Sequence, residues 1–449
     1  MCQSETKLEI LQWNELTSAE REAALKRAPA NRDQRVQESV AKIVDRVRLQ
    51  GDQAIRELTL EFDGVPIENC LVSSCDLQSA SDQLPADLKA AIDVAFGNIQ
   101  KFHHAALPNS FAIETSPGVE CSTKYLGIET VGMYAPGGAT PLPSSVLMMG
   151  VPAMIAGCGT KVLCSSPNAE GKIDPAIAYA AKLCQVDRVF LIGGAQAIAA
   201  MAYGTQSVPA CDKIFGPGSV WVTEAKRQVA ADSSPVTIDM AAGPSEVLVV
   251  ADDSADPEFI AADMLAQLEH GTDSQAILVT DSSRIASQTA AAVQRMAESL
   301  SRVQQVQESM SHSRVILTID MQQAMVVANR YAAEHLILQA KDSQQLAGKI
   351  TAAGSVFVGK WTPEVLGDYC SGTNHVLPTC GLARSVNGLS TADFMKRITF
   401  QSASADGLSG LAQTATTLAR WEQLTAHALA VDVRLSAIDS GRNTEEVSL

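Results

Sequence analysis

The feature that most constrains the fold is an alternation of apolar segments, small-residue turns and helical segments between residues 128 and 358. The apolar segments, typical of buried strands, are IETVGMY, KVLCSS, RVFLIGG, KIFGPG, EVLVVA, AILVT, VILTID and SVFVG. Strand, turn and helix repeated in this order predict parallel sheets covered by helices. We therefore expect an α/β fold with two doubly wound, Rossmann-like parallel-sheet domains and a ligand crevice at the carboxyl ends of the strands.

The segments outside this alternation are expected to be mostly helical. Residues 1–28 hold a strand-like piece and a helix that Thr17 or Ser18 can cap, which predicts an arm that packs on something larger. Amphipathic spacing and Pro85 predict helices over 34–51 and 85–106, and His103 and His104 are expected to be exposed polar residues. Residues 390–449 are expected to be mostly helical, as in arms that pack on a neighbouring subunit.

These patterns predict four parts of the chain. They are an N-terminal arm (1–28), a main α/β domain (29–133 with 245–389), a Rossmann-like domain (134–244) and a C-terminal helical arm (390–449). The glycine-rich turns fall in the Rossmann-like part, and most of the polar histidine-containing segments fall in the main domain.

Composition excludes several classes of function. The formal net charge of −16 argues against a nucleic-acid or anionic-membrane surface and is compatible with a cationic small substrate. The first residues carry charge and no long apolar core, and no segment reaches the ~18 apolar residues of a membrane span, so we expect a cytoplasmic protein. The ten cysteines form no CxxC pair, which favours reduced thiols over a thiolate zinc site.

One helix, in DPEFIAADMLAQLEHGTD, presents two candidate ligands at its end. Asp256 can cap it, Pro257 fits its first turn, and Gly271 is a suitable left-handed stop. Gln267 and His270 then lie on one helical face, where an amide oxygen and an imidazole nitrogen can form half of a metal site. The alternative is a polar last turn with the histidine near the negative end of the helix dipole, and this segment alone favours that alternative.

Other histidines also lie in polar settings. Glu334 and His335 stand where a helix gives way to an apolar strand, as an acid/base pair or as an exposed turn. Asp368 and His375 belong to the turn-rich loop GDYCSGTNHVLP, and loops placed by a rigid sheet often carry function. His427 lies on a C-terminal helix, where an isolated histidine is more often packed or solvated. No HExxH motif is present, which disfavours a zinc protease of that type.

Three small-residue turns connect a strand end to a helix start: Tyr134-Ala-Pro-Gly-Gly138, Gly193-Gly-Ala-Gln196 and Gly216-Pro-Gly-Ser219. The backbone N–H groups of such turns suit a phosphate or pyrophosphate. No GxGxxG pattern follows these strands, so the turns alone support nucleotide binding only weakly, and glycines that merely make tight turns remain the alternative.

Taken together, several segments make the chain resemble the histidinol dehydrogenase family from about residue 31 to 435. They are VGMYAPGG, VFLIGGAQAIAAMAYGT, KIFGPGSVWVTEAKRQV, IDMAAGPSEVLVVAD, AQLEHGTDSQ, AAEHLI and GDYCSGTNHVLPT. The resemblance implies oxidation of L-histidinol through L-histidinaldehyde to L-histidine, the end of histidine biosynthesis, with two NAD and one bound zinc per site. It also implies a homodimer in which the C-terminal arm reaches the partner's active site.

The resemblance also implies roles for individual residues. The zinc ligands would be Gln267, His270, Asp368 and, from the other subunit, His427. The acid/base residues would be Glu334 and His335. The substrate contacts would be Ser245, Gln267, His270, His335, Asp368, His375, Glu422 and His427. The NAD contacts would be Tyr134, Gln196 and Ser219; the family usually has Asn at the last position, so we expect a weaker or re-routed contact there.

Three other functions fit parts of the sequence. The nearest is a paralogous zinc- and NAD-dependent alcohol dehydrogenase acting on another polar alcohol, such as a sulfonated diol; His375, Glu422 and Ser245 favour histidinol. A catalytically inactive zinc-binding protein would have no need of Glu334 and His335. A zinc hydrolase would need no NAD.

Overall fold

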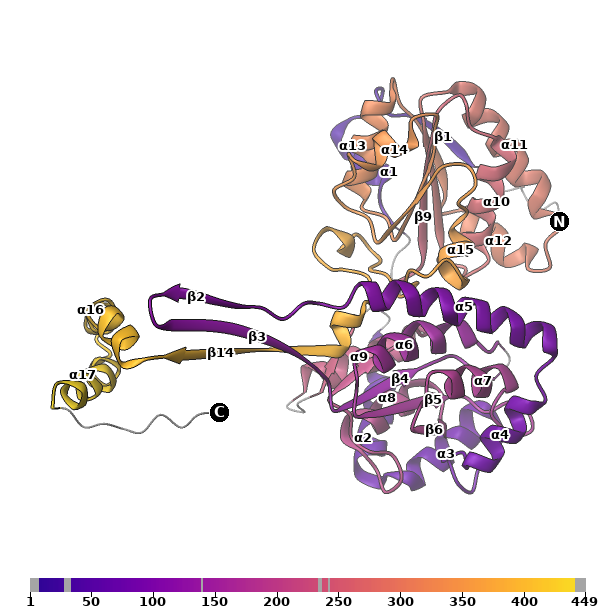
Figure 1. The fold of residues 1–449 in the computed structure, drawn as a ribbon. Coiled ribbons are helices and arrows are strands. Elements are labelled where there is room, and N and C mark those ends of the chain that lie inside the picture. Colours follow the sequence, from indigo (N-terminus) through magenta and orange to yellow (C-terminus); the bar gives the residue numbers. More distant parts are fainter. Residues whose placement is uncertain (1–7, 28–33, 139, 233–235, 241–242, 441–449) are drawn as a thin grey trace. The chain divides into compact units, whose positions relative to one another are not determined.

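The computed structural model describes residues 8–27, 34–138, 140–232, 236–240 and 243–440 (Figure 1). The chain forms two compact units: residues 1–106 with 128–394, and residues 107–127 with 395–449. No helix in the described part of the chain is long and apolar enough to cross a membrane.

The first unit contains a six-stranded parallel sheet in the order β1-β11-β10-β9-β12-β13. Its strands are β1 (Glu9–Gln12), β9 (Glu246–Ala251), β10 (Gln275–Thr280), β11 (Arg314–Leu317), β12 (His335–Gln339) and β13 (Ser355–Val358). Strands β10 and β11 follow β9 on one side, whereas β12 and β13 lie on its other side. The strand order therefore reverses between β9 and β12. The described residues of the predicted N-terminal arm supply β1, an edge strand of this sheet.

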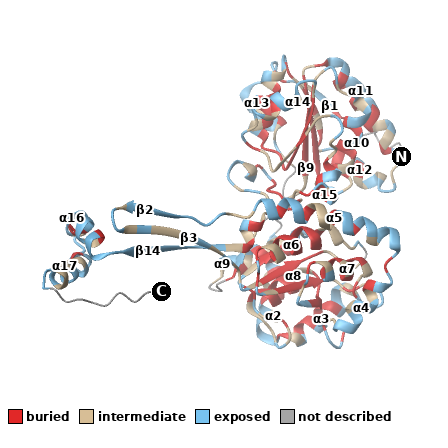
Figure 2. Ribbon diagram, viewed as in Figure 1, coloured by how far each residue is buried: buried red, intermediate tan, exposed pale blue. Residues whose placement is uncertain are grey.

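Helices cover both faces of this sheet, as predicted for a doubly wound fold (Figure 1). One core joins the sheet to α10 (Pro257–Leu268), α11 (Ser283–Ala297) and α12 (Val303–Met310). The other core joins it to α1 (Ser18–Ala24), α13 (Met321–Tyr331) and α14 (Ser343–Ala347). Thr17 caps α1 in a reciprocal capping box with Glu20. Figure 2 shows the central strands as buried, which explains their continuous apolar sequences.

The first unit also contains a five-stranded parallel sheet in the order β6-β5-β4-β7-β8, which reverses between β4 and β7. Its strands are β4 (Thr130–Tyr134), β5 (Thr160–Ser165), β6 (Arg188–Leu191), β7 (Lys213–Phe215) and β8 (Thr237–Ile238). Its helices include α4 (Ser74–Asp82), α5 (Ala86–Ala105), α6 (Pro143–Ile155), α7 (Pro175–Leu183), α8 (Gly194–Tyr203) and α9 (Val220–Ala231).

Helices α2 (Gln34–Gln50) and α3 (Asp52–Asp63) pack on this five-stranded sheet. The sequence analysis grouped residues 29–133 with 245–389. In the structure Val40, Val47 and Ile55 instead share a core with Ile198 of α8 and Val229 of α9. An amphipathic pattern predicts an apolar helix face without naming the sheet that covers it, which accounts for the difference.

His103 differs from its prediction. It lies near the end of α5, as expected, but its side chain is fully buried rather than exposed, whereas the neighbouring His104 is exposed. Its Nε2 atom lies 3.4 Å from Asn374 Nδ2, and Thr391 donates a hydrogen bond to its carbonyl oxygen. Burial lowers the pKa of His103 to about 4, so this histidine is a neutral core residue at pH 7.

The second unit combines an antiparallel sheet, in the order β14-β3-β2, with two helices. Its elements are β2 (Ala112–Ser116), β3 (Val119–Gly127), β14 (Met395–Ala403), α16 (Ala405–Trp421) and α17 (Thr425–Asp439). The helices agree with the predicted C-terminal arm, but β14 lies within residues 390–449, which were expected to be mostly helical. β14 pairs with β3 along its whole length, and its β-branched and aromatic residues Ile398, Thr399 and Phe400 suit a strand.

Candidate active site

Most of the predicted catalytic and metal-binding residues lie at the amino ends of β9 and β12, next to the reversal of strand order. Ser245 precedes β9, Glu334 precedes β12, and His335 is the first residue of β12. The crevice was expected at the carboxyl ends of the strands, whereas these predicted residues lie at the amino ends of this sheet. Helix α10 follows β9 and returns to the amino end of the sheet, so its last turn brings Gln267 and His270 there.

Helix α10 begins as predicted and ends earlier. The carboxylate of Asp256 accepts a hydrogen bond from the N–H of Glu258, but the helix stops at Leu268 and Gly271 does not adopt a left-handed conformation. Gln267 is fully buried, and its Nε2 atom lies 3.3 Å from Nδ1 of His270. The Gln267 Oε1 atom is also buried and has no hydrogen-bond partner. Gln267 is therefore a buried residue, whereas His270, two residues after the end of the helix, is exposed.

His335 lies between two carboxylates. Its Nε2 atom is 3.3 Å from Asp368 Oδ1 and its Nδ1 atom is 3.7 Å from Glu334 Oε2. Burial opposes a charge on this ring, but Glu334, Asp368 and Glu364 outweigh it and raise the pKa of His335 to about 10. Burial raises the pKa of Glu334 to about 7 despite the neighbouring histidine. The pair therefore has one group that readily holds a proton beside another that can exchange one near neutral pH.

Helix α15 (Glu364–Tyr369) and the loop after it complete this side of the site. Nδ1 of His375 lies 2.8 Å from the carbonyl oxygen of Asp368, and its Nε2 atom lies 3.5 Å from Ser145 Oγ. Burial lowers the pKa of His270, and Asp368 partly opposes this. Burial alone would raise the pKa of Asp368, but His335, His375 and His270 lower it. These side chains thus belong to one electrostatic cluster.

The donor set at this cluster fits a zinc ion with open positions. Gln267 offers an oxygen without a protein partner, while His270 and Asp368 offer nitrogen and oxygen. In the described part of the chain, no group of three or more His, Cys, Asp or Glu side chains could hold a metal ion. The predicted set needs only two such side chains from this unit, because its third member is an amide.

Glu364, which the sequence analysis did not single out, also belongs to the cluster. It starts α15 one turn before Asp368, is fully buried, and neither of its carboxylate oxygens has a hydrogen-bond partner. Burial raises its pKa to about 8, although His335 opposes this. The i, i+4 spacing of Glu364 and Asp368 in PEVLGDYC was the available signal.

Glu422 and His427 belong to the second unit. Glu422 ends α16, His427 lies in the first turn of α17, and both are exposed. Their predicted role in an active site completed by a partner subunit remains a prediction.

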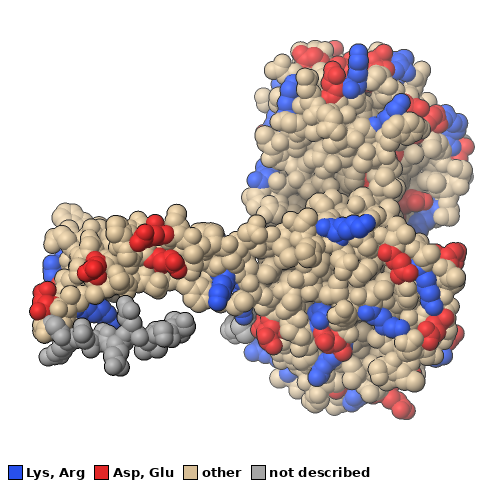
Figure 3. Space-filling model, in the orientation of Figure 1, with Lys and Arg blue, Asp and Glu red and all other residues tan. Residues whose placement is uncertain are grey.

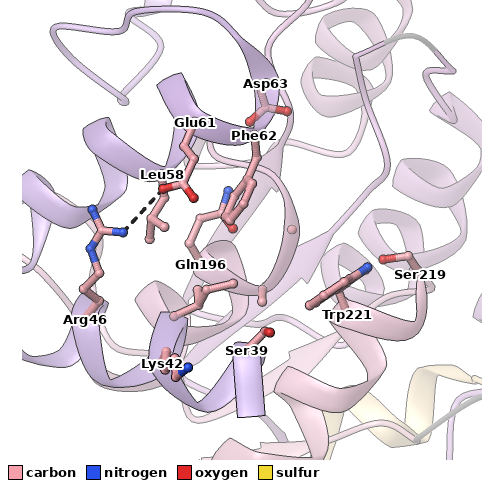
Figure 4. Close-up of a pocket in the computed structure, with 13 residues that line it drawn as sticks. Ser39, Lys42, Arg46, Leu58, Glu61, Phe62, Asp63, Gln196, Ser219 and Trp221 are labelled. Carbon is pink, nitrogen blue, oxygen red and sulfur yellow. Dashed lines mark hydrogen bonds and ion pairs between the residues drawn. The ribbon is translucent and has the colours of Figure 1, made fainter. Parts of the chain in front are cut away.

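A second candidate site lies at the carboxyl ends of the five-stranded sheet, where the glycine turns were predicted to form a crevice. A cavity of about 650 Å³ is lined by Gly194, Gln196 and Ser219 from these turns (Figure 4). Tyr134 lies behind this lining: it is buried, and its hydroxyl accepts a hydrogen bond from the N–H of Gly194 at 3.2 Å. Tyr134 thus braces a turn of the cavity in this structure.

The opposite wall of the cavity comes from α2 and α3, which no nucleotide motif marks. Lys42, Arg46 and Phe62 line it, and Trp221 of α9 lies beside Ser219 (Figure 4). The sequence analysis missed these residues because amphipathic helices of this kind are ordinary in α/β proteins. The same wall also carries the carboxylates of Glu61 and Asp63, and Arg46 pairs with Glu61 at 3.5 Å. The turn N–H groups and the aromatic side chains are the features of the cavity that suit a nucleotide.

A buried ion pair holds the third turn of this cavity. Lys226 and Asp239 contact each other with almost no exposure. Lys226 Nζ also donates to the carbonyl of Gly216 at 2.9 Å, and the N–H of Gly216 donates to Asp239 at 2.8 Å. Both backbone polar groups of Gly216 are thereby fixed, with Ser219 three residues further on at the start of α9.

Comparisons with known proteins show which family this chain resembles. The family model described as histidinol dehydrogenase matches residues 26–435. A histidinol dehydrogenase of Vibrio parahaemolyticus is 49% identical over 430 residues, covering 96% of this chain and 99% of the relative. One from Aliivibrio fischeri is 48% identical over 431 residues, covering 96% and 97%. The crystal structure of histidinol dehydrogenase from Elizabethkingia anophelis matches with a TM-score of 0.92 and 39% identity, covering 97% of this chain and 100% of that chain.

Proposed function

The chain belongs to the histidinol dehydrogenase family of oxidoreductases in histidine biosynthesis, and from that premise we propose a specific assignment of its two sites. The cluster at the six-stranded sheet binds L-histidinol with one zinc ion, and the cavity at the five-stranded sheet binds NAD. Two successive NAD-dependent oxidations convert the alcohol through L-histidinaldehyde to L-histidine. The comparisons do not support the alternative of an alcohol dehydrogenase for another substrate.

Gln267, His270 and Asp368 would hold the zinc together with His427 of a partner chain. When bound, the ion would anchor the imidazole and amine nitrogens of the substrate and so fix the alcohol carbon in place. The orphaned Oε1 atom of Gln267 supports this assignment, because a buried amide oxygen without a partner is costly unless it meets a ligand. The exposure of His427 in its own chain supports its availability to a partner.

In the first oxidation His335, acting in its neutral form, takes the hydroxyl proton while hydride leaves the same carbon for NAD. Glu334 then removes a proton from water, and the resulting hydroxide adds to the aldehyde carbon while the carbonyl oxygen takes a proton from the protonated His335, which gives the hydrate. The hydrate loses a second hydride to NAD and one hydroxyl proton, giving the carboxylic acid, which ionises to the carboxylate. The closeness of Glu334 to the His335 ring supports this division, since the two proposed acid/base groups then face the same substrate carbon.

The cavity at the five-stranded sheet suits the phosphates and base of NAD. Backbone N–H groups at the start of α8 and α9 are suited to anions, and Phe62 and Trp221 supply aromatic surface. On the face drawn in Figure 3, the Lys and Arg side chains of the described residues are interspersed with Asp and Glu rather than joined in a basic strip. We expect a cytoplasmic homodimer with no nucleic-acid partner.

The observation that carries the proposal is the convergence of Gln267, His270 and Asp368 on Glu334 and His335. The test is NADH formation by the zinc-loaded protein with L-histidinol, with a sulfonated diol as the competing alcohol. We expect two NADH per histidinol, none with the diol and none without NAD. Product formation without NAD would indicate a hydrolase, and no turnover of histidinol would overturn the proposal.

Mixing two inactive variants tests the shared site. Asp368→Ala and His427→Ala each remove one ligand, so each homodimer should lose zinc and activity. A mixed dimer contains one site that lacks both ligands and one site that keeps both, and should recover part of the activity. Failure of every mixture to recover zinc or activity would place all ligands of a site in one chain.

A further inference from the structure

Arg27, at the end of the N-terminal segment, reaches a buried carboxylate next to the active site. Its Nε and Nη2 atoms both contact the carboxylate of Glu246, the second of them at 2.9 Å. Nη2 also donates to the carbonyl of Tyr331 at 2.6 Å, and the guanidinium lies 4.0 Å from the centre of the Tyr331 ring. The side chain of Glu246 is 2% exposed, so Arg27 neutralises a charge that water does not reach.

The backbone N–H of Glu246 and that of Glu334 each donate a hydrogen bond to the side-chain carboxylate of the other residue. The N–H of Glu246 donates to Glu334 Oε2 at 2.9 Å, and the N–H of Glu334 donates to Glu246 Oε1 at 3.3 Å. They precede or begin adjacent parallel strands, so their exchange fixes the ends of β9 and β12 together. The carboxylate proposed to activate water is therefore oriented by the residue whose own carboxylate Arg27 neutralises.

The buried side chain of Tyr331 makes two further polar contacts. Tyr331 donates its hydroxyl to Gln275 Oε1 at 2.6 Å and lies 3.3 Å from Glu246 Oε2. These contacts are neutral, so Arg27 is the cation in the set. Loss of that cation would leave Glu246 as a buried, uncompensated anion, which must move, take up a proton or admit water. Each response changes the backbone and the field around Glu334.

We infer that Arg27 and Glu246 are positioning residues that hold Glu334 in place for the second oxidation. This inference rests on the proposed function, because it assigns Glu334 to the hydration of the aldehyde. It makes the N-terminal segment a part of the catalytic apparatus, although no residue of that segment contacts the substrate cluster in the described structure. Strand β1 pairs with β11 and so attaches the segment to the same sheet, which keeps Arg27 close to Glu246.

The test compares the two NADH-forming steps in Arg27→Met. We expect the first NADH from histidinol at nearly the wild-type rate and the second roughly 10- to 100-fold slower, since an acid/base group out of place loses much of its effect. The KM for histidinol and the zinc content should not change. Arg21→Met is the matched control: Arg21 lies in the same segment and stacks on Trp13, with no contact to Glu246. Its two steps should both match wild type.

Arg27→Lys and Glu246→Gln keep the inference testable where Arg27→Met folds poorly. Arg27→Lys keeps the charge and should retain the second step within about fivefold of wild type. The titratable groups around Glu334 are Glu246, His335, Asp368, Glu364 and Cys380. Glu246→Gln removes one anion that raises the pKa of Glu334, so the acidic limb of the second step should move to lower pH.

The outcomes separate this inference from the proposed function. Failure of the wild-type protein to oxidise histidinol, or an unaffected second step in Glu334→Gln, would overturn the proposed function itself. A wild-type protein that forms two NADH, with a second step unchanged in Arg27→Met and an acidic limb unmoved in Glu246→Gln, would overturn the positioning role alone. An equal slowing of both steps in Arg27→Met would also overturn it.

Discussion

The two parallel sheets of the first unit are built alike, but their candidate sites lie at opposite ends of the strands. In the five-stranded sheet the candidate cofactor cavity lies at the carboxyl ends of the strands and is formed largely by turns. In the six-stranded sheet the candidate catalytic cluster lies at the amino ends and consists of polar side chains, most of them buried. Both sites adjoin the place where the strand order reverses.

This difference matches the charge of the proposed ligands. At the carboxyl ends of parallel strands the following helices begin, and helix N-termini favour anions such as a pyrophosphate. At the amino ends the same helices finish, and their C-termini favour cations. The end of α10 thus faces a site proposed for a zinc ion and a cationic substrate. One architecture offers two electrostatically opposite places, and this chain has a candidate site at each.

The largest effect should come from the proton acceptor at the six-stranded sheet. His335→Ala should lower turnover of histidinol by at least about 100-fold, because general acid–base groups contribute that much or more. Zinc content should remain at the wild-type level, and His104→Ala, which changes an exposed histidine, should behave as wild type. Metal analysis beside steady-state kinetics checks both. Loss of zinc from His335→Ala would show that His335 is needed for metal binding and would contradict its assignment as a proton acceptor alone.

A buried carboxyl in α10 should make the stability of the six-stranded half depend on pH. Asp263 accepts a hydrogen bond from Gln339, and burial raises its pKa to about 7. The folded chain then holds a proton that the unfolded chain releases, so this residue costs stability as pH rises from about 4 to 7. Asp263→Asn should gain about 2 to 4 kcal/mol at pH 8 and almost nothing at pH 4.

Denaturant unfolding of Asp263→Asn across this pH range measures that gain. Asp45→Asn, at an exposed position of α2, is the control and should show no pH-dependent gain. An Asp263→Asn protein that is equally stabilised at both pH values would assign the effect to packing rather than to charge.

Removing Lys226, which holds the turn at Gly216, should affect only the candidate NAD cavity at the five-stranded sheet. Lys226→Met removes the cation that holds the carbonyl of Gly216, so we expect the KM for NAD to rise about tenfold as the turn shifts. The kcat at saturating NAD and the KM for histidinol should be nearly unchanged. Arg227→Met, at the next and more exposed position, is the control. A fall in kcat with an unchanged KM for NAD would contradict the assignment of this cavity.

The smallest effect should come from restoring the family's usual residue at the same turn. Ser219 precedes α9 and its hydroxyl makes no capping bond, so it is available to a ligand in the cavity. Ser219→Asn provides a longer donor and acceptor and should lower the KM for NAD by about two- to fivefold, the free energy of one modest hydrogen bond. Ser219→Ala should raise it by a similar factor. Equal KM values in all three proteins would remove this position from the proposed contacts.

The sequence predicted the parts of the fold whose signal is local. Strands such as β9 and β10 are buried on both faces and read as uninterrupted apolar runs, and the turns after β6 and β7 carry their glycines. Strand β14 gave no such signal, because eight of its nine residues are exposed and it depends on pairing with β3. Long-range packing likewise decided which sheet α2 and α3 cover.

The candidate site shows the same division. The short motifs containing Gln267, His270, Glu334, His335 and Asp368 placed these residues together through the family resemblance. The amino-end location, however, follows from how α10 returns along the sheet. The partners behind the site could not be found from local patterns. The contact of Arg27 with Glu246, for example, joins residues 219 positions apart.

The edge strand β1 has a consequence for synthesis of the protein. Glu9 pairs with Arg314, so β1 has no partner strand until Arg314 and the residues after it have been translated. The five-stranded sheet, whose strands lie between Thr130 and Ile238, can assemble meanwhile. The nascent chain must therefore keep β1 from pairing wrongly, and the six-stranded sheet is necessarily the later of the two sheets to be completed.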